Sequence, residues 1–342
     1  MRVLVTGHLG YIGTLLTRML VDEGYEVCGI DSDLFRRCTF CEGIVDVPTI
    51  CADIRDIGAD AVRGFDAVVH LAALANDALG DLDPEMTLDV NYRATVRLAE
   101  LCKGVGVERF IFSSSCSNYG AAGEEVLTEE SPFRPVTAYG QSKVLAEEAL
   151  SEMAADGFSP TILRNATCYG VSPRLRFDLV LNNLVAWGVT TGKILLKSDG
   201  SPWRPVAHVE DVCRAFIAVL EAPTELVHNE AFNVGRTSEN YRIGELARIV
   251  AETMPQCGVE FADGASPDKR CYRVNCDKIA RRLKDFRPQW DARRGAEQLC
   301  ATFKSKGLAL EEFEGTKYKR VSHLRKLMED GIVGSDLRYR AQ

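Results

Sequence analysis

The sequence has no excess of positive charge and no apolar stretch that approaches the length of a membrane span. Its 41 basic and 49 acidic residues give a net charge of −8, which argues against a nucleic acid or an anionic membrane surface as partner. Residues 1–7 run directly into a predicted strand and a glycine turn and leave no room for a signal peptide. We therefore expect a cytoplasmic protein.

The twelve cysteines lack the spacing of a disulfide framework or a metal site. They are spread through segments with helix or strand periodicity, as expected of reduced, mostly buried thiols. Cys38 and Cys41 form a C-x-x-C pair, but no second pair follows at the spacing of a zinc ribbon. We predict loop thiols at these two positions and no bound metal.

The first segment of the chain has the pattern of a strand, a glycine turn and a helix. Residues 2–6 predict a buried strand, and residues 15–20 carry leucine and methionine at helical spacing. Between them, Gly7, Gly10 and Gly13 permit a tight turn and a close approach of the backbone to a ligand. The N-terminus of the helix offers free N–H groups to a pyrophosphate.

The second predicted strand, residues 25–30, ends in Asp31, eighteen residues after Gly13. A carboxylate at this position can accept both ribose hydroxyls of an adenosine and repels a 2′-phosphate. The sequence therefore favours NAD over NADP, although Arg36 and Arg37, just beyond, are of the residue type that accommodates such a phosphate.

Strands and helices continue to alternate along the chain. Further strands are predicted to close at residues 52–54 and to span 67–73, 109–115 and 159–163, and helices to span 84–103 and 139–155. This alternation indicates an α/β fold with a Rossmann-type, doubly wound parallel sheet, whose ligands lie at the carboxyl ends of the strands. Ser115 ends one of these strands and is expected to face the ligand.

Tyr139 and Lys143 lie four residues apart on a predicted helix and so share a face. A phenol titrates near pH ~10, so its use as a base at neutral pH requires a pKa about three units lower, or about 4 kcal/mol of preferential stabilisation of the phenolate. An adjacent ammonium can supply part of this stabilisation. The alternative interpretation is a pair of surface side chains on an amphipathic helix.

Taken together, these motifs resemble the extended short-chain dehydrogenase/reductases, the NAD-dependent nucleotide-sugar epimerases and dehydratases, over roughly residues 1–300. The UDP-galactose 4-epimerases are the nearest functional template. The motifs that carry the resemblance are T-G-x-x-G-Y-I-G, Asp31, Asp53-Ile54, His70-Leu71-Ala72-Ala73, Asn91, Ser113-Ser114-Ser115 with Tyr119-Gly120, and Tyr139-x-x-x-Lys143. The resemblance implies that NAD is bound by Gly7, Gly10, Tyr11, Ile12, Gly13, Asp31, Asp53, Ile54, Leu71, Ala72, Ala73, Tyr139 and Lys143.

The resemblance also implies a chemistry, which is transient oxidation of the sugar at C4 to a 4-keto intermediate. Tyr139 matches the base that takes the hydroxyl proton, and Ser115 matches the catalytic Ser/Thr that hydrogen-bonds the same oxygen. Lys143 matches the residue that binds the nicotinamide ribose and tunes the tyrosine. Asn91 matches an asparagine near the active-site helix and is expected to be structural.

Cys116 and Ser117 occupy positions at which the family's 4,6-dehydratases carry Asp and Glu. Without this carboxylate pair, an ordinary 4,6-dehydratase is not expected. A thiol with a pKa near ~8.5 can in principle act as an acid or a base, so Cys116 is included among the candidate catalytic residues. The alternative is a small packing residue beside the nicotinamide.

Several residues in the second half match the family's substrate side. Thr167 stands where an asparagine usually contacts the sugar or phosphate, and Asn183 and Leu184 match an N-N-L segment that opens a helix against the diphosphate. Arg204 lies in an R-x-x-x-H-V-x-D element and is expected to bind a phosphate through its guanidinium.

His208, in the same element as Arg204, is expected to be a structural hydrogen-bonding residue. The segment in which the family usually has a second phosphate-binding arginine lacks it, and either Arg270 or Arg273, which flank Tyr272, could take that role.

The resemblance implies two interleaved domains and a dimer. Residues 1–170 with 206–235 are expected to bind NAD, and residues 171–205 with 236–305 to form a smaller α/β domain for the nucleotide sugar. Residues 306–342 form a C-terminal tail; its stretch 317–340 has seven basic and three acidic side chains and suggests no chemistry. The two long predicted helices pair with their symmetry mates in this family, so we expect a homodimer.

Three functions remain open. The first is a nucleotide-sugar 4-epimerase that needs only Ser115, Tyr139 and Lys143. The second is a dehydratase, 3- or 5-epimerase, decarboxylase or 4-ketoreductase of the same family, in which Cys116 or another residue acts after oxidation. The third is a binding protein that senses NAD.

Overall fold

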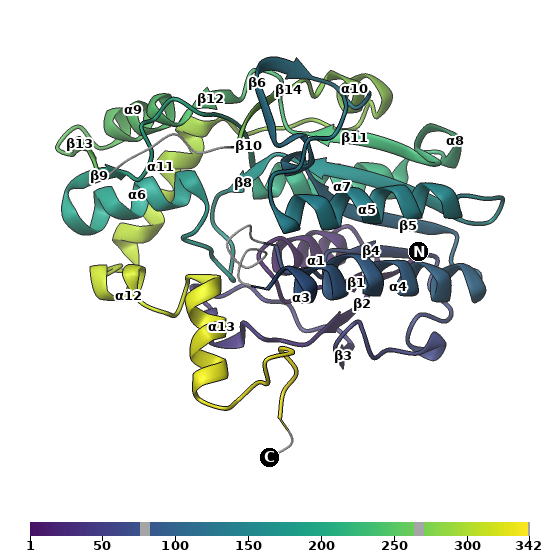
Figure 1. The fold of residues 1–342 in the computed structure, drawn as a ribbon. Helices are drawn as coiled ribbons and strands as arrows, with labels where there is room; N and C mark the ends of the chain where they lie inside the picture. Colours follow the sequence, from purple (N-terminus) through teal and green to yellow (C-terminus); the bar gives the residue numbers. More distant parts are fainter. Residues whose placement is uncertain (76–82, 263–269, 341–342) are drawn as a thin grey trace.

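The computed structural model describes residues 1–75, 83–262 and 270–340. Its largest element is a seven-stranded sheet with the order β11-β7-β5-β4-β1-β2-β3, in which all neighbours are parallel (Figure 1). The strands are β1 (Arg2–Thr6), β2 (Glu26–Asp31), β3 (Thr49–Cys51), β4 (Ala67–His70), β5 (Arg109–Ser115), β7 (Ser159–Asn165) and β11 (Glu230–Val234). The strand order reverses between β1 and β4, so a crevice opens there at the carboxyl ends of the strands. The predicted doubly wound sheet is confirmed.

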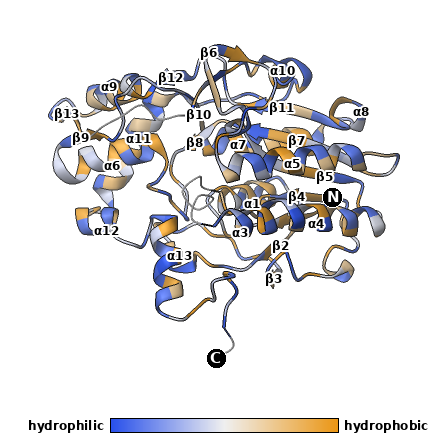
Figure 2. Cartoon of the chain, in the orientation of Figure 1, coloured by the Kyte–Doolittle hydropathy of each residue, from blue (hydrophilic) through white to orange (hydrophobic). Residues whose placement is uncertain are grey.

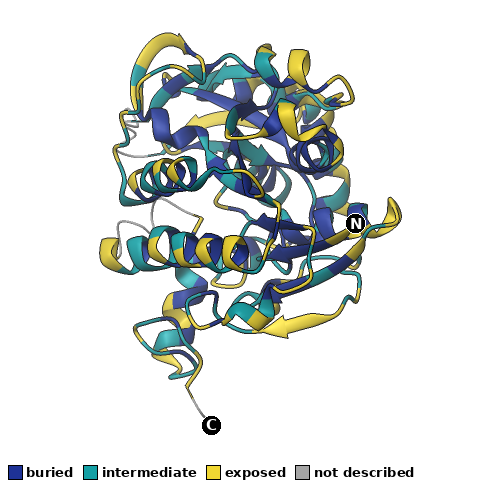
Figure 3. Ribbon diagram, turned by 90° about the vertical axis from the view of Figure 1, so that its right-hand side faces the viewer, coloured by how far each residue is buried: buried dark blue, intermediate teal, exposed yellow. Residues whose placement is uncertain are grey.

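Side chains of β1 alternate between two cores on opposite faces of the sheet, as the two-residue period of a strand requires. Val3 and Val5 pack with α1 and α7, whereas Leu4 packs with α4 and α5. The helices on these faces are α1 (Gly13–Asp22), α7 (Val209–Glu221), α4 (Ala94–Gly104) and α5 (Ala138–Met153). Because both faces are covered, the central strands are apolar and buried, as Figures 2 and 3 show.

Smaller sheets and a separate core are built mostly by the second half of the chain. The strands are β8 (Thr167–Tyr169), β10 (Trp203–His208) and β12 (Asn240–Arg242) in one sheet, β9 (Lys193–Leu196) with β13 (Gly258–Phe261), and β6 (Ala121–Leu127) with β14 (Cys271–Val274). The remaining helices are α6 (Val180–Thr191), α8 (Thr224–Val227), α9 (Ile243–Thr253), α10 (Asp277–Arg282), α11 (Ala292–Ser305), α12 (Leu310–Glu314) and α13 (Arg320–Glu329). Phe177 lies at the centre of this core and meets the rings of Phe303, Phe313 and Tyr318 edge to face.

Some boundaries differ from the sequence-based expectation. The strand predicted over residues 67–73 ends at His70, so Leu71–Ala73 leave the sheet at its carboxyl edge. The helix predicted over residues 84–103 is divided into α3 (Pro84–Leu88), a π-helical turn over Asp89–Arg93, and α4. Such wide turns often accompany a functional site. Here the turn carries the buried Asn91, which donates a hydrogen bond to Ser142 of helix α5.

The thiols behave as reduced core residues. All twelve cysteines are free, more than half of them are buried, and Cys38 of the C-x-x-C pair is fully buried. In the parts of the chain that the structure describes, no group of three or more His, Cys, Asp or Glu side chains is arranged to hold a metal ion. No helix in the same parts is long and apolar enough to cross a membrane.

Candidate active site

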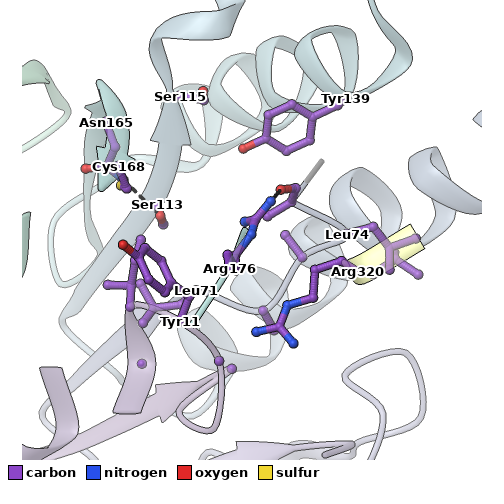
Figure 4. A pocket seen from close by; sticks show the side chains of 18 of the residues that line it. Tyr11, Leu71, Leu74, Ser113, Ser115, Tyr139, Asn165, Cys168, Arg176 and Arg320 are labelled. Atoms are coloured by element: carbon purple, nitrogen blue, oxygen red, sulfur yellow. Dashed lines mark hydrogen bonds between the residues drawn. The ribbon is translucent and has the colours of Figure 1, made fainter. Parts of the chain in front are cut away.

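One large pocket opens at the carboxyl edge of the sheet and brings together most of the residues singled out in the sequence (Figure 4). Those that line it are Gly7, Gly10, Tyr11, Ile12, Gly13, Asp31, Asp53, Ile54, Leu71, Ala72, Ala73, Ser115, Tyr139, Lys143, Thr167, Arg204 and Arg270. Cys116, Asn183, Leu184 and Arg273 lie outside its lining. The pocket therefore contains the expected cofactor residues and three of the four expected catalytic residues.

The glycine turn is shaped for close approach of a ligand. Gly7 has a φ of 75°, and a Cβ at this position would lie 2.7 Å from the backbone nitrogen of Ala72. At Gly13 a Cβ would clash with the carbonyl oxygen of Gly7. Helix α1 begins at Gly13 without a side-chain cap. The N–H groups of Thr14 and Leu15 donate to the carbonyl oxygens of Gly10 and Ile12, so an anion at the turn is favoured mainly by the positive end of the helix dipole. These features fit the pyrophosphate of a dinucleotide.

Asp31 stands at the end of β2, where the adenosine ribose of a dinucleotide is expected. Its two oxygens accept hydrogen bonds from the backbone N–H groups of Leu9, at 2.9 Å, and Asp33, at 2.7 Å. Each oxygen retains lone pairs for a ribose diol. Arg36 and Arg37 are exposed and lie outside the pocket lining.

Ser115 is held at the end of β5 with its hydroxyl oxygen already engaged as an acceptor. Its Oγ accepts from the backbone N–H of Ser117, at 3.1 Å, and from the Ser117 hydroxyl, at 2.9 Å. Because that oxygen accepts two hydrogen bonds, the Ser115 proton is available for donation to another oxygen. Ser117 also lines the pocket, which makes it a site residue that the sequence analysis did not select.

Lys143 is buried beneath Tyr139 on α5. Its Nζ donates to the carbonyl oxygen of Ser113 at 2.8 Å and lies 4.5 Å from the centroid of the Phe112 ring. Burial lowers the pKa of Lys143 to about 7, against an opposing effect of the nearby Glu147 carboxylate. The side chain is thus poised between its charged and neutral forms at neutral pH. Figure 4 shows the Tyr139 ring directed into the pocket.

A buried polar network fixes α5 against β5 and β7 behind the pocket. Glu147 forms an ion pair with Arg164 at 2.8 Å and accepts hydrogen bonds from Ser114 and Asn118. Arg164 also donates to the Tyr119 hydroxyl at 3.0 Å. Because each charge is paired, the network holds the helix that carries Tyr139 and Lys143 in a defined position.

Asn91 and His208 have the structural surroundings expected of them. Asn91 is fully buried; it accepts from the backbone N–H of Leu74 at 2.8 Å and donates to the Ser142 hydroxyl at 3.2 Å, which joins the β4 loop to α5. His208 stacks on the Trp290 ring with 3.9 Å between centroids, outside the pocket lining.

Cys116 is turned away from the pocket. It is fully buried, its thiol donates to the carbonyl oxygen of Arg164 at 3.1 Å, and it packs with Tyr119 and Tyr272. Burial raises the pKa of the thiol well above its usual value. A protonated thiol outside the pocket is not placed to act as an acid or a base, which corrects its inclusion among the catalytic residues and agrees with the packing alternative.

The start of α6 differs from the expected N-N-L contact. The helix begins at Val180, so Val180 and the preceding Leu179 line the pocket instead of Asn183 and Leu184. Asn183 donates to the carbonyl oxygen of Phe177 at 2.9 Å, and Leu184 is only 3% exposed in the core. The contact surface is therefore one helical turn nearer the N-terminus than expected.

The two alternatives for a second phosphate-binding arginine differ in position. Arg270 lines the pocket. The Arg273 guanidinium lies 4.7 Å from the centre of the Trp203 ring and donates to the carbonyl oxygen of Glu124, away from the pocket lining. Of the two, Arg270 alone can meet a ligand in this pocket.

Other residues that were not selected from the sequence also line the pocket. Arg176 forms an ion pair with Asp178 at 2.7 Å, and both line the pocket ahead of α6. Arg320 and Leu337 come from the C-terminal tail, for which no chemistry was expected. Arg176 and Asp178, two residues apart just before a helix, could have been selected from the sequence. Arg320 and Leu337 could not, because their contacts join segments 140 to 300 residues apart and leave no local pattern.

Comparison with known proteins gives a consistent result. The NAD dependent epimerase/dehydratase family matches residues 3–235. UDP-glucose 4-epimerase of Bacillus subtilis (strain 168) is 28% identical over 329 residues, covering 88% of this chain and 95% of the relative. UDP-glucuronic acid decarboxylase 1 of Arabidopsis thaliana is 26% identical over 324 residues, covering 92% and 72%.

Among solved structures, MoeE5 in complex with UDP-glucuronic acid and NAD superposes with a TM-score of 0.78 at 27% identity, covering 89% of this chain and 99% of that one. These relatives differ in the reaction that their names describe, but they share the fold. Because the family match spans more than half of the sequence and the pocket has the glycine turn and Asp31 that suit a dinucleotide, the protein belongs to the NAD dependent epimerase/dehydratase family and its cofactor is NAD.

Proposed function

We propose that the protein is a nucleotide-sugar epimerase that acts through a transient 4-keto sugar and inverts C4. The observation that carries this proposal is that Ser115, Tyr139 and Lys143 line one pocket, while no carboxylate occupies position 116 or 117. Oxidation and return of hydrogen at C4 require only the first three side chains, whereas elimination of water requires an additional acid and base.

Each side chain has a distinct role in this proposal. Tyr139 takes the proton from the C4 hydroxyl and later returns it, and Ser115 donates a hydrogen bond to the same oxygen. Lys143 contributes positive charge beneath the Tyr139 ring, which favours the phenolate. When bound, NAD supplies the reversible two-electron acceptor for the sugar carbon.

The sugar nucleotide is proposed to lie on the side of the pocket formed by the second half of the chain. Arg204 is only 6% exposed, and its guanidinium lies 5.4 Å from the centre of the Tyr272 ring, so its orientation is restrained. With Arg270 it is suited to a diphosphate. On this basis residues 1–170 with 206–235 serve the cofactor, and residues 171–205 with 236–305 serve the sugar nucleotide.

Decarboxylation of a nucleotide-linked uronic acid is the second candidate. Arg176, Arg204 and Arg270 line the pocket, and cations of this kind can hold a sugar carboxylate. Oxidation at C4 places a ketone β to that carboxylate, and a β-keto acid loses carbon dioxide without a further acid or base in the protein. One relative and one structural neighbour carry the corresponding substrate in their names.

Incubation with UDP-glucose, UDP-glucuronic acid and dTDP-glucose, followed by proton NMR of the products, tests both candidates. Inversion at C4 without change of mass supports the epimerase, and a pentose from UDP-glucuronic acid supports the decarboxylase. Loss of water from any substrate contradicts both. Absence of turnover across a wide panel, with NAD bound, would leave the NAD-sensing binding protein as the better explanation.

We also propose a cytoplasmic homodimer. The free, mostly buried thiols suit a reducing compartment. Leu145 lies on the same face of α5 as Gln141 and Glu148, both exposed, and so presents an apolar side chain at the outer surface of the helix. An isologous interface through α5 and the neighbouring α4 would cover it.

A further inference from the structure

The C-terminal tail packs against the rim of the cofactor pocket. Arg338 forms an ion pair with Asp56 at 2.8 Å, and Arg55 donates to the carbonyl oxygen of Asp336 at 2.7 Å. Both partners follow β3 and the nearby pocket residues Asp53 and Ile54. In Figure 1 the yellow α13 accordingly lies beside the purple N-terminal part of the chain. The tail side of this contact lies outside residues 3–235, to which the family match extends.

The same tail has an apolar contact with the pocket wall. Leu324, Leu327 and Leu337 form a buried cluster with Leu74, which follows β4 and lines the pocket. Leu337 itself is part of the pocket lining. The tail is therefore a wall of the cofactor site and not a free extension.

Arg320, the first residue of α13, is the charged group that the tail brings into this wall (Figure 4). It is only 4% exposed. Its Nη2 donates to the carbonyl oxygen of Arg174 at 2.8 Å, and its guanidinium lies 4.2 Å from the centre of the Phe35 ring. Its Nη1 is buried and has no hydrogen-bond partner among the described residues.

Among the described residues, Arg320 is the arginine of this wall that has no ion-pair partner of its own, and the longer-range charge of Asp178 favours its charged form. Arg174 is paired with Asp33 at 3.0 Å and Arg176 with Asp178 at 2.7 Å. Within residues 1–75, 83–262 and 270–340, no carboxylate forms an ion pair with Arg320. Burial lowers the pKa of Arg320 to about 10, so the side chain remains charged at neutral pH.

A buried guanidinium with an open donor is unfavourable unless an anion pairs with it. Phosphate oxygens match the guanidinium fork in charge and geometry. We propose that Arg320 binds a phosphate of the bound dinucleotide, so that the C-terminal tail acts as a clasp whose docking is coupled to cofactor binding. The inference depends on the pocket being the NAD site and not on which sugar is converted.

The position of Arg320 favours the dinucleotide over the sugar nucleotide. Its guanidinium lies on Phe35, which follows Asp31 and Asp33 at the end of β2, on the side where the adenosine half of the cofactor is expected. Arg204 and Arg270, which we propose bind the sugar diphosphate, belong instead to the residues assigned to the sugar nucleotide, 171–205 and 236–305. If the cofactor binds more tightly when the tail is docked, then the bound cofactor must stabilise the docked tail by the same factor.

Binding of ADP-ribose to NAD-free protein, measured by calorimetry, tests the assignment without turnover. ADP-ribose keeps the adenosine and pyrophosphate of NAD. We expect Arg320→Gln to weaken its binding by about ten- to a hundred-fold, the range for a charged hydrogen bond, and to leave adenosine binding unchanged. Arg325→Gln is the matched control, because Arg325 is exposed on the same helix; it should change neither.

Unchanged ADP-ribose affinity in Arg320→Gln overturns the proposal. The proposal is also overturned if Arg320→Gln weakens the binding of UDP alone or of NADP alone. Arg320 would then bind a phosphate of the sugar nucleotide or a 2′-phosphate. Hydrogen exchange of the wild-type protein gives a second readout that does not depend on a variant's folding. Saturation with ADP-ribose should slow exchange in α13, and unchanged exchange there would overturn the coupling.

Discussion

The Lys143 ammonium lies 5.9 Å from the centroid of the Tyr139 ring, one turn along the same helix. It is anchored by its hydrogen bond to the Ser113 carbonyl oxygen, and burial lowers its pKa to about 7. The charge that we propose favours a Tyr139 phenolate is therefore itself sensitive to pH in the neutral range. The expected acid–base behaviour of the site follows from this pair.

Tyr139→Phe is expected to lower turnover by about two to four decades, because it removes the group that we propose takes the hydroxyl proton. The ring remains, so packing against Lys143 and NAD affinity should change little. Steady-state kinetics with the identified substrate and a cofactor titration give the two quantities. Retention of most of the turnover would show that another group is the base.

The buried Lys143 is expected to make stability rise with pH near neutrality. Its folded-state pKa of about 7 lies below the usual 10.5, so between these values the unfolded chain binds a proton that the folded chain has lost. The free energy of unfolding of NAD-free protein should therefore increase from pH 7 to 8 by about 1 kcal/mol more than that of Lys143→Met. Urea titrations at the two pH values measure this difference, and equal slopes for both proteins would contradict the shifted pKa.

Asp31→Ala is expected to narrow the preference for NAD over NADP. In the proposed site the wild-type carboxylate hydrogen-bonds the ribose diol and repels a 2′-phosphate, and the substitution would remove both effects. NAD should bind more weakly to the variant, while NADP should bind as well as before or better. A wild-type protein that binds NADP more tightly than NAD would refute the role of Asp31.

The fold was predictable because its signals are local. The apolar run of β1, the glycines at 7, 10 and 13, and the alternation of strands and helices are each contained within about 30 residues of chain, and the strand order follows from the doubly wound pattern. The π-helical turn at Asp89–Arg93 was not predictable, because it depends on where Asn91 meets Leu74 and Ser142.

The candidate site was predictable only for residues whose place on a strand or helix fixes where the side chain lies. Ser115 and Tyr139 were found because each stands at a fixed place on its strand or helix. The orientation of Cys116 is different: only the backbone turn after β5 decides whether this side chain meets the pocket or the core. Arg320 could not be found, since its contact with Phe35 joins segments nearly 300 residues apart.

Leu145→Arg is expected to convert the proposed homodimer to a monomer. The change places a charge on the outer face of α5, where the interface would bury an apolar side chain. Light scattering at micromolar concentration reports the mass of each protein. Val259→Arg, at a half-exposed apolar position on β13, is the control and should remain dimeric. A monomeric wild-type protein would refute the proposal.

Cys116→Ser separates the plain epimerase from a mechanism that uses the thiol. Serine is slightly smaller, and its hydroxyl can donate to the Arg164 carbonyl oxygen as the thiol does. Because Cys116 is buried away from the pocket, the variant should keep most of its activity and its NAD affinity. Ser115→Ala, on the adjacent residue that lines the pocket, should lose activity under the same conditions. Loss of turnover in Cys116→Ser comparable to that in Tyr139→Phe, with normal folding and NAD binding, would instead require a thiol that reaches the substrate during the reaction.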